Sequence, residues 1–311
     1  MKNVIVSGAT GFIGRWLVNE LISHEVNVKA VLRDKSKLPN EILENPYFSF
    51  VEKDLLDISC EDFEGDYDCF YNLAWGGVRP QDKNDFDLQI ENIKLSIHAM
   101  EIAKEVGVKK FIGIGTVAEY VFSNDVMNFN EKQTPNDMYG AAKVANYHFL
   151  GVRARQLGID FIWAVLPSTY GEYREDNNII TYTIKSLINK EVPKYGNLNQ
   201  MWDFLYVADV VRALRLIGEK GISGKVYGIG SGEYRPLNEY ISIIRNNINP
   251  ELELGIGEVP DLSNKTYSSC VNIFELCRDT GFRPTTGFEE GIKKTIDFWM
   301  QKYKSNRTER L

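Results

Sequence analysis

Asn3-Val4-Ile5-Val6-Ser7-Gly8-Ala9-Thr10-Gly11-Phe12-Ile13-Gly14 opens the chain and decides its fold. An apolar run breaks into a glycine turn, after which Ile13, Leu17 and Leu21 recur with helical spacing. A buried strand, a glycine turn and a helix in this order let backbone N–H groups approach a pyrophosphate closely. The stretch therefore predicts the first unit of a dinucleotide-binding domain.

Apolar runs alternate with helix-length periodic segments, which is typical of β-α-β units and a parallel sheet. The strand-like runs are Val4–Val6, Val28–Leu32, Phe48–Val51, Cys69–Leu73, Phe111–Ile114, Phe161–Leu166 and Val226–Ile229. Later helices are expected over 85–106, 137–157, 179–189, 237–247 and 287–303. We expect an α/β fold, a Rossmann-like doubly wound parallel sheet with a smaller, discontinuous C-terminal substrate-binding region. Residues 1–168 would form the NAD(P)-binding domain, with a return segment near 203–232, and 169–311 mainly the substrate-binding region.

Composition excludes several classes of function. The 311 residues carry a formal net charge of −7 and their Lys and Arg are scattered, which argues against a nucleic-acid or anionic membrane surface. The first strand begins at about the third residue and no apolar run approaches a membrane span, so we expect a cytoplasmic protein. Four cysteines without a C-x-x-C pair and three histidines predict reduced thiols and no metal site.

The end of the second expected strand bears on the choice of cofactor. It reads Val31-Leu32-Arg33-Asp34, where such units usually carry an acid that binds the ribose 2′-hydroxyl. If Leu32 holds that place, no carboxylate repels a 2′-phosphate and Arg33 can pair with it bidentately. This favours NADP (NADPH). The alternative is a solvated Arg33 with Asp34 binding the ribose of NAD.

Two further strand ends are expected to contact the cofactor. Asp54-Leu55 is placed to meet the adenine amino group, although Asp54 could equally cap the segment that follows. Asn72-Leu73-Ala74-Trp75 should lie along the pyrophosphate and the nicotinamide ribose, or be an ordinary buried strand end.

Tyr139 and Lys143 stand one helical turn apart in Tyr139-Gly-Ala-Ala-Lys143. A free phenol has a pKa of about 10 and transfers protons poorly near neutrality. We expect the Lys143 cation to lower the pKa of Tyr139 and to hold the cofactor ribose, while Thr116 orients the substrate oxygen. The alternative is a surface pair that interacts only weakly.

With these motifs in this order, the chain resembles the extended short-chain dehydrogenases/reductases of the NAD-dependent epimerase/dehydratase family, most of which act on nucleotide sugars. The landmarks are Gly8–Gly14, Asp54-Leu55, Asn72–Trp75, Asn92, Thr116, Tyr139 with Lys143, Thr169–Gly171 and Asp203–Asp209. The resemblance implies Thr116, Tyr139 and Lys143 as the catalytic residues. It implies as cofactor contacts Gly8, Thr10, Gly11, Phe12, Ile13, Gly14, Arg33, Asp54, Leu55, Leu73, Ala74, Trp75, Asn92, Tyr139, Lys143 and Pro167.

Departures from the family patterns narrow the reaction. Members that dehydrate a sugar resemble Thr-Asp-Glu-x-Tyr where this chain has Thr116-Val117-Ala118-Glu119-Tyr120, and neither Val117 nor Ala118 can transfer a proton. Members that epimerise C3 and C5 resemble a pattern with cysteine at the place of Ala118. What remains is reduction of a keto sugar at C4, or 4-epimerisation through a transient ketone.

Leu32-Arg33 favours the reductase, because a reductase exchanges NADPH and NADP in each turnover whereas an epimerase keeps NAD bound. The pattern resembles C4 ketoreductases that make nucleotide-linked deoxysugars for bacterial surface polysaccharides. The alternatives are an NAD-dependent nucleotide-sugar 4-epimerase and a non-catalytic dinucleotide sensor, which would lack the Tyr/Lys pair.

The substrate contacts and the assembly are expected from the same resemblance. The candidate contacts are Trp75, Thr116, Glu119, Tyr139, Ser168, Thr169, Asn177, Asn178, Lys194, Trp202 and Arg235. Trp202 stands where the family has an arginine, and would either stack on the base or fill the core. Family members pair two long helices per subunit, so 85–106 and 137–157 predict a homodimer interface.

Overall fold

The computed structural model describes residues 1–120, 126–129, 131–260 and 269–308, so 261–268 and 309–311 of the expected second region lie outside the described residues. Its centre is a parallel sheet in the order β12-β7-β5-β4-β1-β2-β3. The strands are β1 (Asn3–Ser7), β2 (Asn27–Leu32), β3 (Phe48–Glu52), β4 (Cys69–Asn72), β5 (Lys110–Thr116), β7 (Asp160–Leu166) and β12 (Val226–Gly228). All the predicted strands are confirmed. The chain reverses its direction of travel across the sheet between β1 and β4, where such sheets bind ligands beyond the carboxyl ends of the strands.

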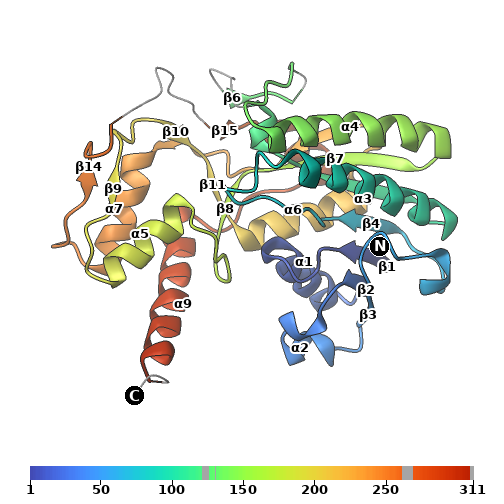
Figure 1. The fold of residues 1–311 in the computed structure, drawn as a ribbon, viewed down its shortest axis with the longest axis horizontal. Helices are drawn as coiled ribbons and strands as arrows, with labels where there is room; N and C mark the ends of the chain where they lie inside the picture. Colours follow the sequence, from blue (N-terminus) through green and yellow to red (C-terminus); the bar gives the residue numbers. More distant parts are fainter. Residues whose placement is uncertain (121–125, 130, 261–268, 309–311) are drawn as a thin grey trace.

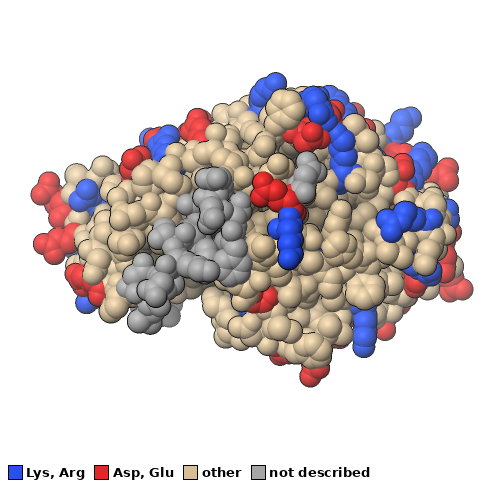
Figure 2. Space-filling model, turned by 90° about the horizontal axis from the view of Figure 1, so that it is seen from above, with Lys and Arg blue, Asp and Glu red and all other residues tan. Residues whose placement is uncertain are grey.

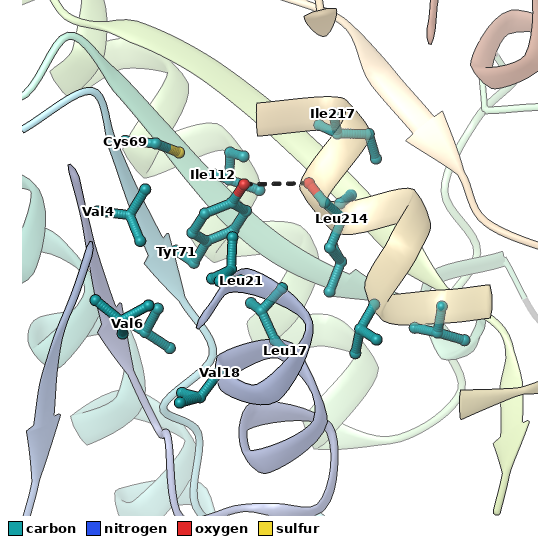
Figure 3. Packing of buried hydrophobic residues seen from close by; sticks show 14 of the residues in the cluster. Val4, Val6, Leu17, Val18, Leu21, Cys69, Tyr71, Ile112, Leu214 and Ile217 are labelled. Atoms are coloured by element: carbon teal, nitrogen blue, oxygen red, sulfur yellow. Dashed lines mark hydrogen bonds between the residues drawn. The ribbon is translucent and has the colours of Figure 1, made fainter. Parts of the chain in front are cut away.

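Helices cover both faces of this sheet (Figure 1). α1 (Phe12–Ser23) and α6 (Val207–Lys220) pack on one face, and α3 (Phe86–Glu105) and α4 (Met138–Leu157) on the other. In Figure 3, Tyr71 of β4 reaches between α1 and α6, and its hydroxyl donates a hydrogen bond to the carbonyl of Leu214, 3.3 Å away. The predicted Rossmann-like doubly wound fold is confirmed.

The sequence analysis included no helix over α6, and the structure corrects this. Val207, Val210, Val211, Leu214 and Ile217 recur at helical spacing and are all buried. They fill the space between α1 and the sheet, so α6 belongs to the dinucleotide-binding half although it follows most of that half in sequence.

A second core lies beside the sheet, where α5 (Ile179–Ile188), α7 (Leu237–Ile248) and α9 (Phe288–Thr308) surround an aromatic cluster. Tyr240 lies 4.5 Å from Phe288 and 5.0 Å from Phe204 between ring centres. Three short strand pairs lie at this core: β8 (Ser168–Tyr170) with β11 (Phe204–Tyr206), β9 (Lys194–Tyr195) with β14 (Gly255–Ile256), and β10 (Met201–Trp202) with β13 (Arg235–Pro236). A fourth pair in the described part of the chain, β6 (Val126–Met127) with β15 (Cys270–Val271), lies outside it, and Met127 packs in the core that α3 and α4 cover. The segments of the second core come from both sides of β12 in sequence, so the smaller region is discontinuous.

The remaining helices are short: α2 (Asn40–Leu43), α8 (Phe274–Thr280), and the 3₁₀ turns η1 (Lys35–Lys37), η2 (Cys60–Asp62) and η3 (Val117–Tyr120). The face seen in Figure 2 intersperses basic and acidic side chains. Across the described ranges, no helix combines the length and the apolar character needed to cross a membrane. All four cysteines carry free thiols.

Candidate active site

The glycine turn between β1 and α1 forms the first wall of the site. Gly8 has a φ of +72°, and a Cβ there would lie 2.8 Å from the backbone of both Leu73 and Ala74. A Cβ on Gly14 would overlap the carbonyl oxygen of Gly8, so only glycine lets α1 pack so closely on the turn. The N-cap of α1 is Gly11 with no side-chain cap, which leaves the first helical N–H groups available to an anion. This cradle fits the pyrophosphate of a dinucleotide.

At the end of β2, Leu32 is buried and the Arg33 side chain is 81% exposed. The Arg33 guanidinium lies 4.0 Å from the Asp54 carboxylate, a weak surface pair. Asp34 accepts hydrogen bonds from the Ser36 N–H and hydroxyl, which lower the pKa of its carboxyl group. Asp54 accepts from the Leu56 N–H, and Leu55 is buried. The carboxylate of Asp34 is therefore engaged locally, while Arg33 is exposed and only weakly paired.

The loop after β4 is held from two sides. Ser7 Oγ donates to Asn72 Oδ1 at 2.7 Å and accepts from Ala74 N–H at 3.3 Å, which ties the loop to β1. Asn92 of α3 bonds both backbone groups of Gly76, accepting its N–H and donating to its carbonyl. Asn92 therefore fixes this loop in place, and its contact with a cofactor stays a prediction.

Thr116, Tyr139 and Lys143 come together where β5 ends and α4 begins. The Tyr139 phenol lies close enough to the Thr116 side chain for that hydroxyl to lower the pKa of the phenol. Lys143 Nζ donates to the carbonyl of Ile114 at 2.8 Å and lies 3.6 Å from the Trp75 ring centre. Trp75 also meets Tyr139 edge-on, with 6.4 Å between ring centres. A phenol, an aliphatic hydroxyl and an ammonium thus converge beside the loop after β4, an arrangement suited to proton transfer at a carbonyl oxygen.

The expected lowering of the pKa of Tyr139 is wrong. Burial raises the pKa of Tyr139 to about 12, and the hydrogen bond from Thr116 offsets only part of this. Burial lowers the pKa of Lys143, and the charge of Glu119 opposes that shift. The phenol is therefore protonated at neutral pH, ready to donate.

Glu119 was expected to contact substrate, and its burial argues against this. Its side chain is 0% exposed. One carboxylate oxygen accepts the Thr116 N–H at 2.8 Å, and the other accepts from Trp163 Nε1 and Gln133 Nε2, both at 3.2 Å. The carboxylate lies behind the site, saturated by protein donors.

Three candidate substrate contacts lie together at the entrance to the second core. Trp202 on β10 faces Arg235 on β13 in register, and Trp202 Nε1 donates to Ser168 Oγ at 2.8 Å. All three side chains are half-buried. Pro167 immediately precedes this cluster and is buried.

The structure separates four other candidates from this cluster. The buried Thr169 hydroxyl donates to the Pro167 carbonyl, and Asn178 caps α5 by accepting the N–H groups of Ile180 and Thr181. Lys194, on β9, pairs with Glu258. The strand β9 lies at the left of Figure 1, away from β8 and α4. Asn177 is exposed beside the cap. The polar groups of Thr169, Asn178 and Lys194 are bonded locally, and their contacts with substrate stay predictions.

Several residues that shape the site were missed from the sequence. Gln89 of α3 is buried, accepts the Trp75 indole N–H and donates to the Gly77 carbonyl. Gln89, Asn92 and Ser96 form a buried polar stripe at helical spacing, a signal that the sequence analysis did not use. Trp163 and Gln133 also escaped notice, because their role depends on the fold.

Comparisons with known proteins agree with this geometry. The model of the NAD dependent epimerase/dehydratase family matches residues 4–230. A trifunctional UDP-glucose 4,6-dehydratase/UDP-4-keto-6-deoxy-D-glucose 3,5-epimerase/UDP-4-keto-L-rhamnose-reductase of Arabidopsis thaliana is 26% identical over 96% of this chain, which spans 47% of the plant protein. A dTDP-glucose 4,6-dehydratase of Neisseria meningitidis serogroup B is 24% identical, over 96% of this chain and 94% of the relative.

Among solved structures, the UDP-glucuronic acid 4-epimerase Y149F mutant from Bacillus cereus, in complex with a fluorinated UDP-glucuronic acid and NAD, shares the fold. Its TM-score is 0.88 at 22% identity, and the alignment covers 97% of this chain and 100% of that one. Because the family model spans residues 4–230, which include the glycine turn and the Thr116, Tyr139 and Lys143 set, the chain belongs to the NAD dependent epimerase/dehydratase family.

Proposed function

We propose that this protein reduces the 4-keto group of a nucleotide-linked deoxysugar with NADPH, in the synthesis of bacterial surface polysaccharide precursors. The observation that carries the proposal is the meeting of Thr116, Tyr139 and Lys143 next to a glycine turn that fits a dinucleotide. Val117 and Ala118 follow Thr116 without a group that transfers protons, which weighs against dehydration. The plant relative, of which this chain spans 47%, includes a UDP-4-keto-L-rhamnose-reductase in its name, which supports a keto sugar as the substrate class.

The glycine turn between β1 and α1 would hold a dinucleotide, whose nicotinamide would supply a hydride to the carbonyl carbon. Tyr139 gives its phenolic proton to the carbonyl oxygen, which becomes a hydroxyl group. Burial holds Tyr139 protonated at neutral pH, as a general acid requires. Thr116 orients the oxygen, and the Lys143 ammonium balances the phenolate until solvent returns the proton.

Preference for NADPH rests on the end of β2. Arg33 is exposed and only weakly paired with Asp54, so it is free to bind a 2′-phosphate. Asp34, the alternative ribose ligand, is engaged by Ser36.

The experiment follows NADPH oxidation at 340 nm with a panel of nucleotide-linked 4-keto-6-deoxysugars, and mass spectrometry checks that each product gains two hydrogens. Tyr139→Phe should lower turnover about a hundredfold or more while NADPH binding persists, because general acids contribute at least that much. Tyr147→Phe, on the same helix, should keep turnover. Full activity in Tyr139→Phe would remove the mechanism.

The second candidate is an NAD-dependent nucleotide-sugar 4-epimerase, which the shared fold of the NAD-bound Bacillus cereus epimerase favours. An epimerase retains NAD through purification and interconverts isomers without added cofactor. Release of NAD from the denatured protein, together with such interconversion, would select this candidate over the reductase.

We also propose a homodimer formed through α3 and α4, which lie side by side (Figure 1). Phe86 and Ile90 on α3 and Phe149 and Val152 on α4 are exposed apolar side chains. An apolar surface on two adjacent helices is what a helix-packed dimer buries.

A further inference from the structure

A buried hydrogen-bond network surrounds the Glu119 carboxylate directly behind Thr116. Its three donors come from different parts of the chain: the Thr116 N–H at the end of β5, the Trp163 indole on β7, and the Gln133 amide. The Glu119 carbonyl also accepts the Thr134 N–H at 2.7 Å. Glu119 thus joins β5, β7 and the segment before α4, the three elements that meet at the catalytic set.

Glycine in β5 makes room for this network. A Cβ on Gly115 would overlap the Trp163 ring nitrogen and would lie 2.6 Å from the Glu119 carboxylate. A Cβ on Gly113 would lie 2.5 Å from the Trp163 ring. The glycines therefore admit both a large indole and a buried acid beneath the catalytic residues, a costly arrangement unless the acid is fully bonded.

Glu119 and Lys143 hold the same short stretch of β5. Lys143 Nζ donates to the Ile114 carbonyl, and Glu119 accepts the N–H of Thr116, two residues later. Both side chains are buried, and the negative charge of Glu119 acts on the Lys143 ammonium. A buried cation is stable only with such compensation.

We propose that Glu119 is a positioning residue of the active site, whose buried carboxylate holds Thr116 in place and balances the ammonium of Lys143. This deepens the proposed function, on which its catalytic consequence rests. Glu119 is fully buried behind Thr116, so we infer that it acts through Thr116 and Lys143.

The titratable groups around this network are tyrosines. Tyr139 on α4 and Tyr120 on η3 both feel the charge of Glu119, and burial is the main reason that the pKa of each is raised. Tyr147 packs on the Trp163 ring, with 5.7 Å between centres. Burial also raises the pKa of the Glu119 carboxyl group, and the Thr116 N–H, the Trp163 indole and Lys143 oppose that shift. The phenols of Tyr139 and Tyr120 are neutral near pH 7, so Lys143 is the cation whose titration Glu119 governs. Asp137 and Arg174 act on Tyr139, in opposite directions.

The first test compares pH profiles of kcat/KM in the full-length enzyme. Glu119→Gln keeps the shape but removes the charge, so Lys143 loses its proton more easily. The basic limb of the profile, where activity falls as pH rises, should move about one pH unit lower. We also expect kcat to fall about tenfold or more, while KM for the sugar nucleotide stays within about threefold. Glu119→Asp keeps the charge and should restore the position of the limb.

Gln133→Met is the matched control, because it removes one donor to Glu119 and leaves the carboxylate charged. Its basic limb should coincide with that of the wild type. A uniform loss of activity in Glu119→Gln, with no movement of the limb, would overturn the electrostatic role and reduce Glu119 to a structural residue.

A second test needs no turnover, so it separates this inference from the proposed function. Urea unfolding of wild type, Glu119→Gln, Lys143→Met and the double variant forms a double-mutant cycle. If the two charges balance each other, the effects of the two single variants should not add. The folding equilibrium constant of the double variant should then be at least about tenfold larger than the sum of the two single free-energy changes predicts. Additive effects on stability would overturn the pairing of Glu119 with Lys143, even if the enzyme is active. Coupled effects in a protein that reduces no keto sugar would support the pairing and refute the proposed reductase activity.

Discussion

The ammonium of Lys143 lies 3.6 Å from the centre of the Trp75 ring and is shielded by it. The indole N–H donates to Gln89 at 3.0 Å, and the ring edge faces Tyr139. The loop after β4, the buried polar stripe of α3 and the helix α4 are therefore connected through the Trp75 side chain.

Trp75→Ala should shift the pH dependence of turnover. Burial is the main reason that the pKa of Lys143 is lowered, so hydration of the ammonium outweighs the lost cation–π attraction of about 0.5 to 2 kcal/mol. The basic limb of kcat/KM should therefore move to higher pH. Trp75→Phe keeps a ring face and should shift the limb less; identical profiles for the alanine variant and the wild type would contradict the shielding.

Gly14→Ala should destabilise the protein by about 1 to 3 kcal/mol, because the new methyl group overlaps the Gly8 carbonyl oxygen. Gly11→Ala is the comparison, since its Cβ would lie 3.3 Å from the same oxygen. Urea unfolding should rank the alanine variant of Gly14 clearly below that of Gly11. Equal stabilities would mean that α1 can move off the turn at little cost.

Arg33→Ala should lower kcat/KM for NADPH about tenfold or more and change that for NADH much less, because a charged hydrogen bond to the 2′-phosphate is lost. Its side chain is 81% exposed, so unfolding free energy should change by less than about 0.5 kcal/mol. Lys37→Ala, which removes another exposed cation nearby, should leave the cofactor ratio unchanged. An unaltered ratio in Arg33→Ala would argue for NAD.

Asp203 makes stability depend on pH. Burial raises the pKa of Asp203 to about 6, against the hydrogen bonds from Ser231 that lower it. The folded state therefore holds its proton more tightly than the unfolded state does, and this contribution is complete below about pH 4 and lost as pH rises to about 6. Relative to Asp203→Asn, the wild type should lose about 3 kcal/mol of unfolding free energy over that interval. Denaturant unfolding at several pH values checks this, and parallel profiles for the two proteins would refute it.

Phe149→Glu should dissociate the proposed dimer. The side chain is 55% exposed on α4, and a charge there would have to be desolvated in the interface. Sedimentation equilibrium at micromolar concentration should show a monomer. Phe274→Glu, on α8 at 63% exposure, is the matched control and should leave the dimer intact. A dimer in both variants would place the interface elsewhere.

The strands of the sheet and the helices α3, α4, α5, α7 and α9 could be predicted because each carries its own local signal. Buried strands read as short apolar runs, and amphipathic helices repeat every three to four residues. The helix α6 carries the same helical repeat of apolar residues, so it too is predictable from the sequence. Short pairs such as β10 with β13 join two-residue segments distant in sequence, and no local pattern marks them.

Some features of the candidate site likewise follow from the sequence, and others depend on the tertiary structure. Tyr139 and Lys143 are one helical turn apart, so their proximity follows from helix geometry. Glu119 lies three residues after Thr116, yet nothing in that spacing shows that its carboxylate turns inward to meet Trp163, 44 residues away along the chain. Asn178 and Lys194 look equally suited to bind a diphosphate in sequence, and the structure engages one as a helix cap and the other with Glu258.

From the sequence alone came the fold class, the glycine turn and the proposed proton-transfer pair, because strand and helix periodicity and the steric needs of glycine are local properties of the chain. Only the tertiary structure decided which polar groups remain available for chemistry. Burial and hydrogen-bond partners arise from segments far apart in sequence, so they alone raised the pKa of Tyr139, enclosed Glu119 behind Thr116 and covered Lys143 with Trp75.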